Sequence, residues 1–306
     1  MSRSGSGTIA KLAVFSTRHR FCQGEVLRFN PIGSILAPMI KTITRRSFMA
    51  SSALLGVRAA LAFPQAPATA GALDPLLTEN LVAAYRILAQ QGVLDGFGHV
   101  SARHSRAPKR FIMSRSLAPE LVTARDLVEF DLDGNAVDAK GRALYSERFI
   151  HAEIYRGRSD VQAVVHNHAQ SLIPFGVTTV PLRPMYHMAS FIGNGVPVFD
   201  IQKSFGMTDM LVSDSAKGRA LAQVLGDRTC VLMRGHGVAV VGPTIQHAVG
   251  RSVYLEINAR VQIQAMALGG SVTYLDPQEA QKMMDAGENR GYERPWELWK
   301  AKAMGK

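Results

Sequence analysis

Two hydrophobic patterns alternate along the chain after residue 71. Apolar residues recur at helical spacing in residues 77–91, 146–156, 214–225 and 243–268. Short runs rich in Val, Ile, Leu and Phe predict strands at residues 110–113, 127–132, 135–137, 161–168 and 229–241. Asp133-Gly134 is a typical hairpin pair and is predicted to join the second and third of these strands. Because helices and strands interleave, the pattern predicts an α/β fold, a three-layer α/β/α sandwich.

The segment before residue 71 follows a different pattern. Residues 39–70 start with basic side chains, continue with an apolar run and end in a small-residue triplet, which is the layout of a signal peptide. Arg45-Arg46 followed by Ser and Phe resembles the twin-arginine export signal, so we expect the twin-arginine export machinery as a partner and a periplasmic or exported protein. The alternative is a short apolar helix behind a chance Arg pair, which would leave the protein in the cytoplasm. Arg58 interrupts the apolar run, so no stable membrane anchor is expected.

Composition and charge narrow the class of protein. The hydrophobic share of 47% predicts a sizeable core. The net charge of +11 would suggest nucleic acid as a partner, but most of the excess lies before residue 71, and residues 71–306 hold 26 basic and 23 acidic side chains. We therefore expect no nucleic-acid partner. Residues 1–38 are predicted to be an unstructured extension or a misassigned start, and residues 71–306 a single catalytic domain.

A metal site in residues 71–306 must use histidines and carboxylates, because Cys230 is the single cysteine of that part of the sequence. His166 and His168 end a Val-rich strand, and side chains two positions apart on a strand point to the same face. His236 lies between two glycines, which let an ion approach the backbone closely. Three imidazoles without a fourth ligand leave an open coordination position, as in catalytic metal sites. The alternative for the first pair is two exposed loop histidines.

Glu147 opens the helix that precedes the His-x-His strand. A carboxylate there can act as a proton shuttle beside a dication or as a further ligand. The alternative is a charge that only interacts with the helix dipole.

Together these motifs resemble the class II aldolase/adducin family over about residues 76–275. The resemblance rests on Ser146-Glu147 before a helix, AVVHNHA at residues 163–169, and RGHGV at residues 234–238 before a long helix. It implies one divalent metal ion held by His166, His168 and His236, with zinc preferred and manganese, cobalt or iron as alternatives. It also implies an acid/base role for Glu147 and a homotetramer with active sites between subunits.

Departures from the aldolase pattern indicate the substrate class. The family's phosphate-binding aldolases carry Gly-Asn and Thr-Gly where this chain has Gly98-His99 and Ser114-Arg115-Ser116. Their tyrosine acid corresponds to Met188, beside Tyr186 and His187. The chain is instead similar to a decarboxylase branch assigned to hydroxy-aromatic acids, such as dihydroxyphthalate, or to 2-hydroxy-3-carboxymuconic semialdehyde. A small anionic substrate is therefore expected.

These residues predict a carbon–carbon lyase that decarboxylates a small hydroxy-aromatic or hydroxy/keto acid through an enolate stabilised by the metal. Glu147 and His99 are the predicted catalytic residues, and either one would protonate the carbanionic carbon. Arg115 would orient the carboxylate bidentately. The candidate substrate-binding residues are Ser114, Arg115, Ser116, Ser146, Tyr186 and His187. The alternatives are an aldolase or epimerase acting on a sugar or hydroxy acid, phosphorylated or not, and a non-catalytic adducin-like scaffold.

Overall fold

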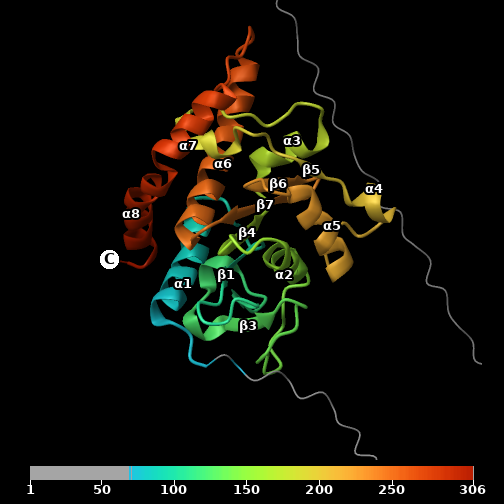
Figure 1. Ribbon diagram of the computed structural model, residues 1–306, viewed down its shortest axis with the longest axis vertical. Helices are drawn as coiled ribbons and strands as arrows, with labels where there is room; N and C mark the ends of the chain where they lie inside the picture. Colours follow the sequence, from blue (N-terminus) through green and yellow to red (C-terminus); the bar gives the residue numbers. More distant parts are fainter. Residues whose placement is uncertain (1–68, 70, 306) are drawn as a thin grey trace, which may run out of the picture. The chain divides into compact units, whose positions relative to one another are not determined.

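The computed structural model describes residue 69 and residues 71–305, with only the backbone of residues 288–291 (Figure 1). The predictions for residues 1–38 and for the signal segment 39–70, apart from residue 69, fall outside the described residues. None of the described helices is long and apolar enough to cross a membrane.

A seven-stranded mixed sheet forms the centre of the fold, with the strand order β3-β2-β1-β4-β7-β6-β5. Neighbouring strands are antiparallel except β5 and β6, which are parallel. The strands are β1 (His99–Arg103), β2 (Arg110–Ser114), β3 (Leu127–Asp131), β4 (Ala163–Asn167), β5 (Val198–Phe199), β6 (Cys230–Met233) and β7 (Gly237–Gly242).

Helices cover both faces of this sheet, which confirms the predicted α/β fold. Figure 1 shows α1 (Pro75–Gln90), α6 (Ile245–Ala267) and α8 (Glu293–Ala303) on one side, and α2 (Arg148–Gly157) and α5 (Ser215–Leu225) on the other. The remaining helices are α3 (Ile173–Val177), α4 (Ile201–Phe205), α7 (Pro277–Gly291) and the 3-10 helices η1 (Pro119–Leu121), η2 (Ala124–Asp126), η3 (Gln170–Leu172) and η4 (His187–Ile192).

Strand β4 shows how the sheet divides the core. Val164 belongs to the hydrophobic cluster beneath α2 and α5, whereas Val165 belongs to the cluster beneath α1 and α6. Because side chains alternate along a strand, His166 lies on the same face as Val164. The first of the predicted metal ligands therefore faces α2.

The four helices predicted from periodicity are confirmed, and each of their ends lies within two residues of the prediction. Two strand predictions were wrong. Residues 135–137 form no strand and contribute only an isolated bridge between Phe130 and Ala136. Residues 229–241 form two antiparallel strands, because Gly235 adopts a left-handed conformation (φ 62°) that reverses the chain.

Candidate active site

The end of β4 and the turn between β6 and β7 bring three imidazoles together. His166 is on β4 and His168 follows that strand directly, while His236 sits in the turn between β6 and β7. The Nε2 atom of His168 lies 3.1 Å from that of His166 and 3.2 Å from that of His236. The convergence predicted from the His-x-His pattern and the Gly-His-Gly turn is therefore present in the structure.

Backbone carbonyls orient two of the three rings. The Nδ1 of His166 donates to the Val238 carbonyl oxygen, and the Nδ1 of His236 donates to the Met210 carbonyl oxygen, each at 3.1 Å. A carbonyl oxygen can only accept, so both rings, when neutral, carry their proton on Nδ1 and keep a lone pair on Nε2. This is the usual way in which a protein fixes the tautomer of a metal-binding histidine.

Gly237 makes this arrangement possible. Side chains of other residues could not fit at this position, because a Cβ there would collide with the backbone oxygen of Asn167. The absence of a side chain lets β7 approach the end of β4 closely, next to His168. The flanking glycine of the sequence motif thus serves the contact between strands.

Glu147 completes the cluster. It is the N-cap residue of α2, yet its carboxylate makes no capping hydrogen bond. Its Oε2 lies 3.5 Å from Nε2 of His166 and 3.4 Å from Nε2 of His236, and its Oε1 accepts a hydrogen bond of 2.9 Å from the Val212 amide. The side chain thus faces the histidines, and the reading as a mere helix-dipole charge does not fit its orientation.

Burial and neighbouring charges set the protonation states of these groups. Burial opposes ionisation of Glu147, but the contacts with His166 and His236 outweigh it and hold the pKa of the carboxyl well below its usual range. Burial together with the neighbouring His166 and His236 lowers the pKa of His168 to about 4, so this ring is neutral at pH 7. Burial lowers the pKa of His236, but Glu147 raises it more, so the net shift is upward.

The four side chains fit a divalent ion. One donor atom from each of Glu147, His166, His168 and His236 lies within 4.8 Å of all the others. Imidazole nitrogens and a carboxylate oxygen are ligands of zinc and related dications, and the buried carboxylate supplies a compensating negative charge.

A cavity of about 440 Å³ lies over this cluster. Its exposed lining is mainly apolar, and Phe97, Leu117, Leu144 and Leu211 are its large apolar residues. Polar groups come from His99, Ser116, Tyr145, Ser146, Glu147, His168 and His236, and glycines 96 and 98 and Ala118 complete it. Among the described residues, no Lys or Arg contributes to this lining.

Of the other predicted site residues, His99, Ser116 and Ser146 line the cavity. Arg115 does not: its Nε donates to Asp126 at 2.7 Å. Ser114 is fully buried, and its hydroxyl donates to the carbonyl oxygen of Arg115. The Nε of Arg115 is thus engaged by an acid on its own chain, and a carboxylate-binding role for Arg115 and Ser114 stays a prediction.

Tyr186 and His187 lie at the start of η4 and do not line the cavity either. Their rings contact each other edge to face. The Tyr186 hydroxyl is buried, and the described residues offer it no hydrogen-bond partner. A substrate-binding role for these two residues stays a prediction.

Three residues near the site were not predicted from the sequence. His151 and Tyr155 belong to α2, and Ser101 belongs to β1; all three are buried and hydrogen-bonded in a chain that ends at His99. His151 is the central member of this chain, bonded through both ring nitrogens. Its spacing of four from both Glu147 and Tyr155 was the available signal, since these positions share one helix face.

Comparison with known proteins places this geometry in a family. Residues 79–263 match the model of the class II aldolase and adducin N-terminal domain. The decarboxylase tropJ of Talaromyces stipitatus is 37% identical over 242 residues, covering 72% of this chain and 91% of that protein. A 3,4-dihydroxyphthalate decarboxylase of Arthrobacter keyseri is 27% identical, covering 71% and 90%.

Solved structures agree with this comparison. The L-fuculose 1-phosphate aldolase of Glaciozyma antarctica superposes with a TM-score of 0.63 at 26% identity, covering 75% of this chain and 90% of that one. An aldolase II superfamily protein of Pseudomonas syringae gives 0.64 at 25% identity, covering 76% and 94%. The named decarboxylases and the aldolase are lyases.

Proposed function

Because the chain belongs to the class II aldolase and adducin family, we propose that it is a metal-dependent carboxy-lyase acting on a small hydroxy-aromatic or hydroxy/keto carboxylic acid. The observation that carries the proposal is the convergence of three Nε2 atoms and the Glu147 carboxylate on one point at the cavity. The decarboxylases among the relatives support the choice of reaction.

The cavity lining favours a flat apolar substrate over a sugar phosphate. Phe97, Leu117, Leu144 and Leu211 offer surfaces for an aromatic ring. A phosphate group usually requires Lys or Arg, or a cradle of backbone amides, and the described lining contains neither cationic residue. A carboxylate placed among apolar side chains loses hydration, which favours its departure as neutral CO₂.

His166, His168 and His236 would hold the ion, with Glu147 beside it, and zinc is our preferred ion because three nitrogen donors suit it. A dication bound there supplies the positive charge that stabilises negative charge on a substrate oxygen during carbon–carbon cleavage. Glu147, ionised in the free protein, is placed to accept a proton from the substrate's hydroxyl group or from water and to return it to carbon, since its Oε2 faces the cluster while Oε1 is fixed by the Val212 amide. Ser116, Ser146 and His99 orient polar groups of the substrate.

The test combines metal analysis with a product assay on the purified full chain. We expect about one equivalent of dication in the wild type and none in His166→Ala, because two imidazoles cannot replace the full ligand set. The wild type, but not the variant, should release CO₂ in a screen of hydroxy-aromatic and keto acids that includes 3,4-dihydroxyphthalate. Absence of metal from well-folded wild type would overturn the proposal and favour an adducin-like scaffold.

Aldol cleavage is the second candidate function, and the superposition on an L-fuculose 1-phosphate aldolase is the observation that favours it. The same samples distinguish the two reactions. Metal without CO₂ release, together with aldehyde release from hydroxy acids or sugar phosphates, would replace decarboxylation by aldol cleavage.

The assembly and location of the protein are further parts of the proposal. We expect a homotetramer, which light scattering of the purified chain tests, with a monomer as the contrary result. We also expect export through the signal at residues 39–70. Replacing Arg45-Arg46 by Lys-Lys should then retain the protein in the cytoplasm, and unchanged fractionation would reject the export prediction.

A further inference from the structure

A continuous chain of buried hydrogen bonds runs from the cavity into the protein. The Nδ1 of His99 lies 2.6 Å from the Nε2 of His151, and the Nδ1 of His151 lies 2.6 Å from the Ser101 hydroxyl. That hydroxyl in turn lies 2.8 Å from the hydroxyl of Tyr155. All four side chains are at most 3% exposed. Buried polar groups linked in this way hold one another in fixed orientations.

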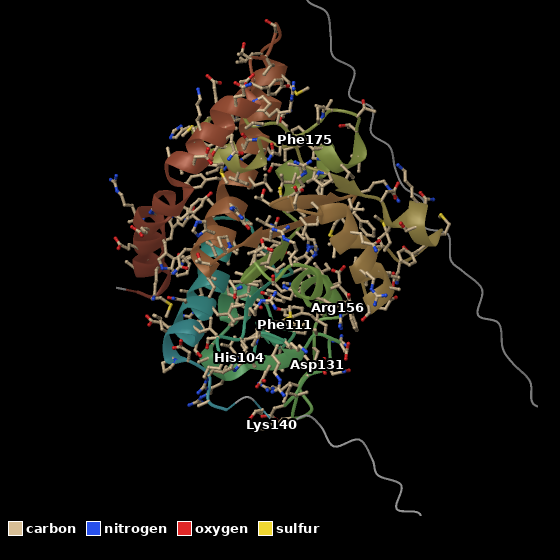
Figure 2. All side chains as sticks on the ribbon, in the orientation of Figure 1. His104, Phe111, Asp131, Lys140, Arg156 and Phe175 are labelled. Atoms are coloured by element: carbon tan, nitrogen blue, oxygen red, sulfur yellow. The ribbon has the colours of Figure 1, made fainter. Side chains whose placement is uncertain are left out.

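Two regular elements supply this chain. His99 and Ser101 are two positions apart on β1 and share a face of the sheet. His151 and Tyr155 are one turn apart on α2, on the face that also carries Glu147. The ring of Phe111, labelled in Figure 2, stacks on His151 with 6.4 Å between centroids and 13° between planes. The hydrogen bonds at both ring nitrogens and this ring hold His151 in its orientation.

The direction of the hydrogen bonds follows from the phenol at the inner end. Burial raises the pKa of Tyr155, so the group keeps its proton. The phenol O–H is therefore present and needs an acceptor in the buried interior. Among the described residues, Ser101 offers the acceptor for it. In the reverse direction the buried O–H would lack an acceptor, which is unfavourable.

Each following proton position is then determined. Ser101 accepts from Tyr155 and donates its own proton to the Nδ1 of His151. His151 must therefore carry its proton on Nε2 and donate it to the Nδ1 of His99. Two protons cannot occupy a 2.6 Å contact between ring nitrogens, so the Nδ1 of His99 is unprotonated. The proton of His99 consequently sits on Nε2, the nitrogen left for the cavity that this residue lines.

We propose that His151 is a positioning residue that fixes His99 as an Nε2–H donor, which hydrogen-bonds the carboxylate of a substrate in the cavity. The substrate class in this inference rests on the proposed function, whereas the tautomer does not. His99 thus takes the anion-binding role that the sequence had suggested for Arg115.

The same chain argues against His99 as the proton source. If His99 gave up its Nε2 proton, replacement through His151 and Ser101 would leave a buried phenolate at Tyr155, which burial disfavours. His99 therefore binds the anion and keeps its proton. Delivery of a proton to carbon is left to Glu147.

The experiment compares His151→Leu with His151→Gln in the zinc-loaded full chain. Leu removes the donor to His99, whereas the Gln amide places an N–H near the position of Nε2 and can still accept from Ser101. The first readout is ¹⁵N NMR of histidine-labelled protein. We expect His99 to be protonated on Nε2 in the wild type and in the Gln variant, and to be a mixture of tautomers in the Leu variant.

The second readout is calorimetric binding of 3,4-dihydroxybenzoate, a hydroxy-aromatic carboxylate. With about a half to a fifth of His99 left in the Nε2–H form, binding should weaken about two- to fivefold in the Leu variant, and the Gln variant should recover most of that loss. KM should rise more than kcat falls, because His99 binds and does not transfer a proton. Zinc content should stay equal in all three proteins.

An Nδ1–H tautomer of His99 in the wild type would overturn the inference. Equal binding by the Leu and Gln variants would do the same. Failure of the wild type to bind 3,4-dihydroxybenzoate would instead count against the proposed substrate class, since the NMR result does not depend on any ligand.

Discussion

Replacing Glu147 by Gln removes one negative charge from the candidate site and changes little else. The Gln carbonyl can still accept the hydrogen bond from the Val212 amide, which in the wild type measures 2.9 Å. The retained bond preserves a contribution of about 0.5–1.5 kcal/mol, so the thermal midpoint should stay near that of the wild type. The three histidines also remain, so we expect metal content to be unchanged.

Turnover should respond very differently from stability. An amide cannot exchange a proton at neutral pH, and a well-placed acid or base contributes about 10²–10⁴-fold to a rate. We therefore expect kcat to fall by that factor while zinc stays at one equivalent. The assay is CO₂ release under saturating substrate, with metal analysis of the same preparation.

Glu153→Gln provides the matched control. Glu153 is a second buried carboxylate on α2, 2% exposed, but it pairs with Arg156 and Arg219 and does not line the cavity. Its loss should affect stability and leave turnover near the wild-type value. If Glu147→Gln retained turnover within about threefold, which is well under the acid–base factor, Glu147 would have no part in proton transfer.

Three further predictions concern the metal site and Arg115. Metal should be retained at pH 7.5 and lost as the pH falls toward 4, because a protonated imidazole cannot bind a metal ion. Burial and the adjacent imidazoles lower the pKa of His168 to about 4, so this ring takes up its proton in that range. Metal analysis that finds the ion retained at pH 4 would contradict this. Gly237→Ala should reduce metal content and the thermal midpoint together, because the Cβ of the new alanine would displace the backbone of Asn167. A variant with the wild-type metal content and thermal midpoint would show that the close approach of the two strands is dispensable. Arg115→Ala should leave the KM for an anionic substrate within about twofold of the wild-type value, because the Arg115 guanidinium pairs with Asp126. A KM increase of about tenfold or more would instead identify Arg115 as the carboxylate ligand.

The amphipathic helices were predictable because their apolar faces repeat over many residues. Strand β5, with two residues, is too short to produce a pattern of its own. The hairpin of β6 and β7 was read as one strand, although Arg-Gly-His-Gly at residues 234–237 separates its two apolar runs and Gly235 reverses the chain there. Local patterns therefore predicted the elements better than their ends and turns.

The metal cluster could be predicted because its residues follow local rules. His166 and His168 share a strand face, and glycines flank His236, so the sequence alone indicated a common site. The surroundings of Arg115 and His151 could not be predicted in this way. Whether an arginine pairs with Asp126 or faces a cavity, and whether a helix histidine is buried against His99, depends on contacts between segments far apart in sequence.

The most direct test of the central claim is CO₂ release from the full chain before and after removal of its metal. A substrate identified in the screen is labelled at the carboxyl carbon, and release is followed for native, chelated and zinc-reconstituted protein. The account predicts that release stops on chelation and returns with about one equivalent of zinc. Release that continues at an unchanged rate in protein shown to contain no metal would contradict it.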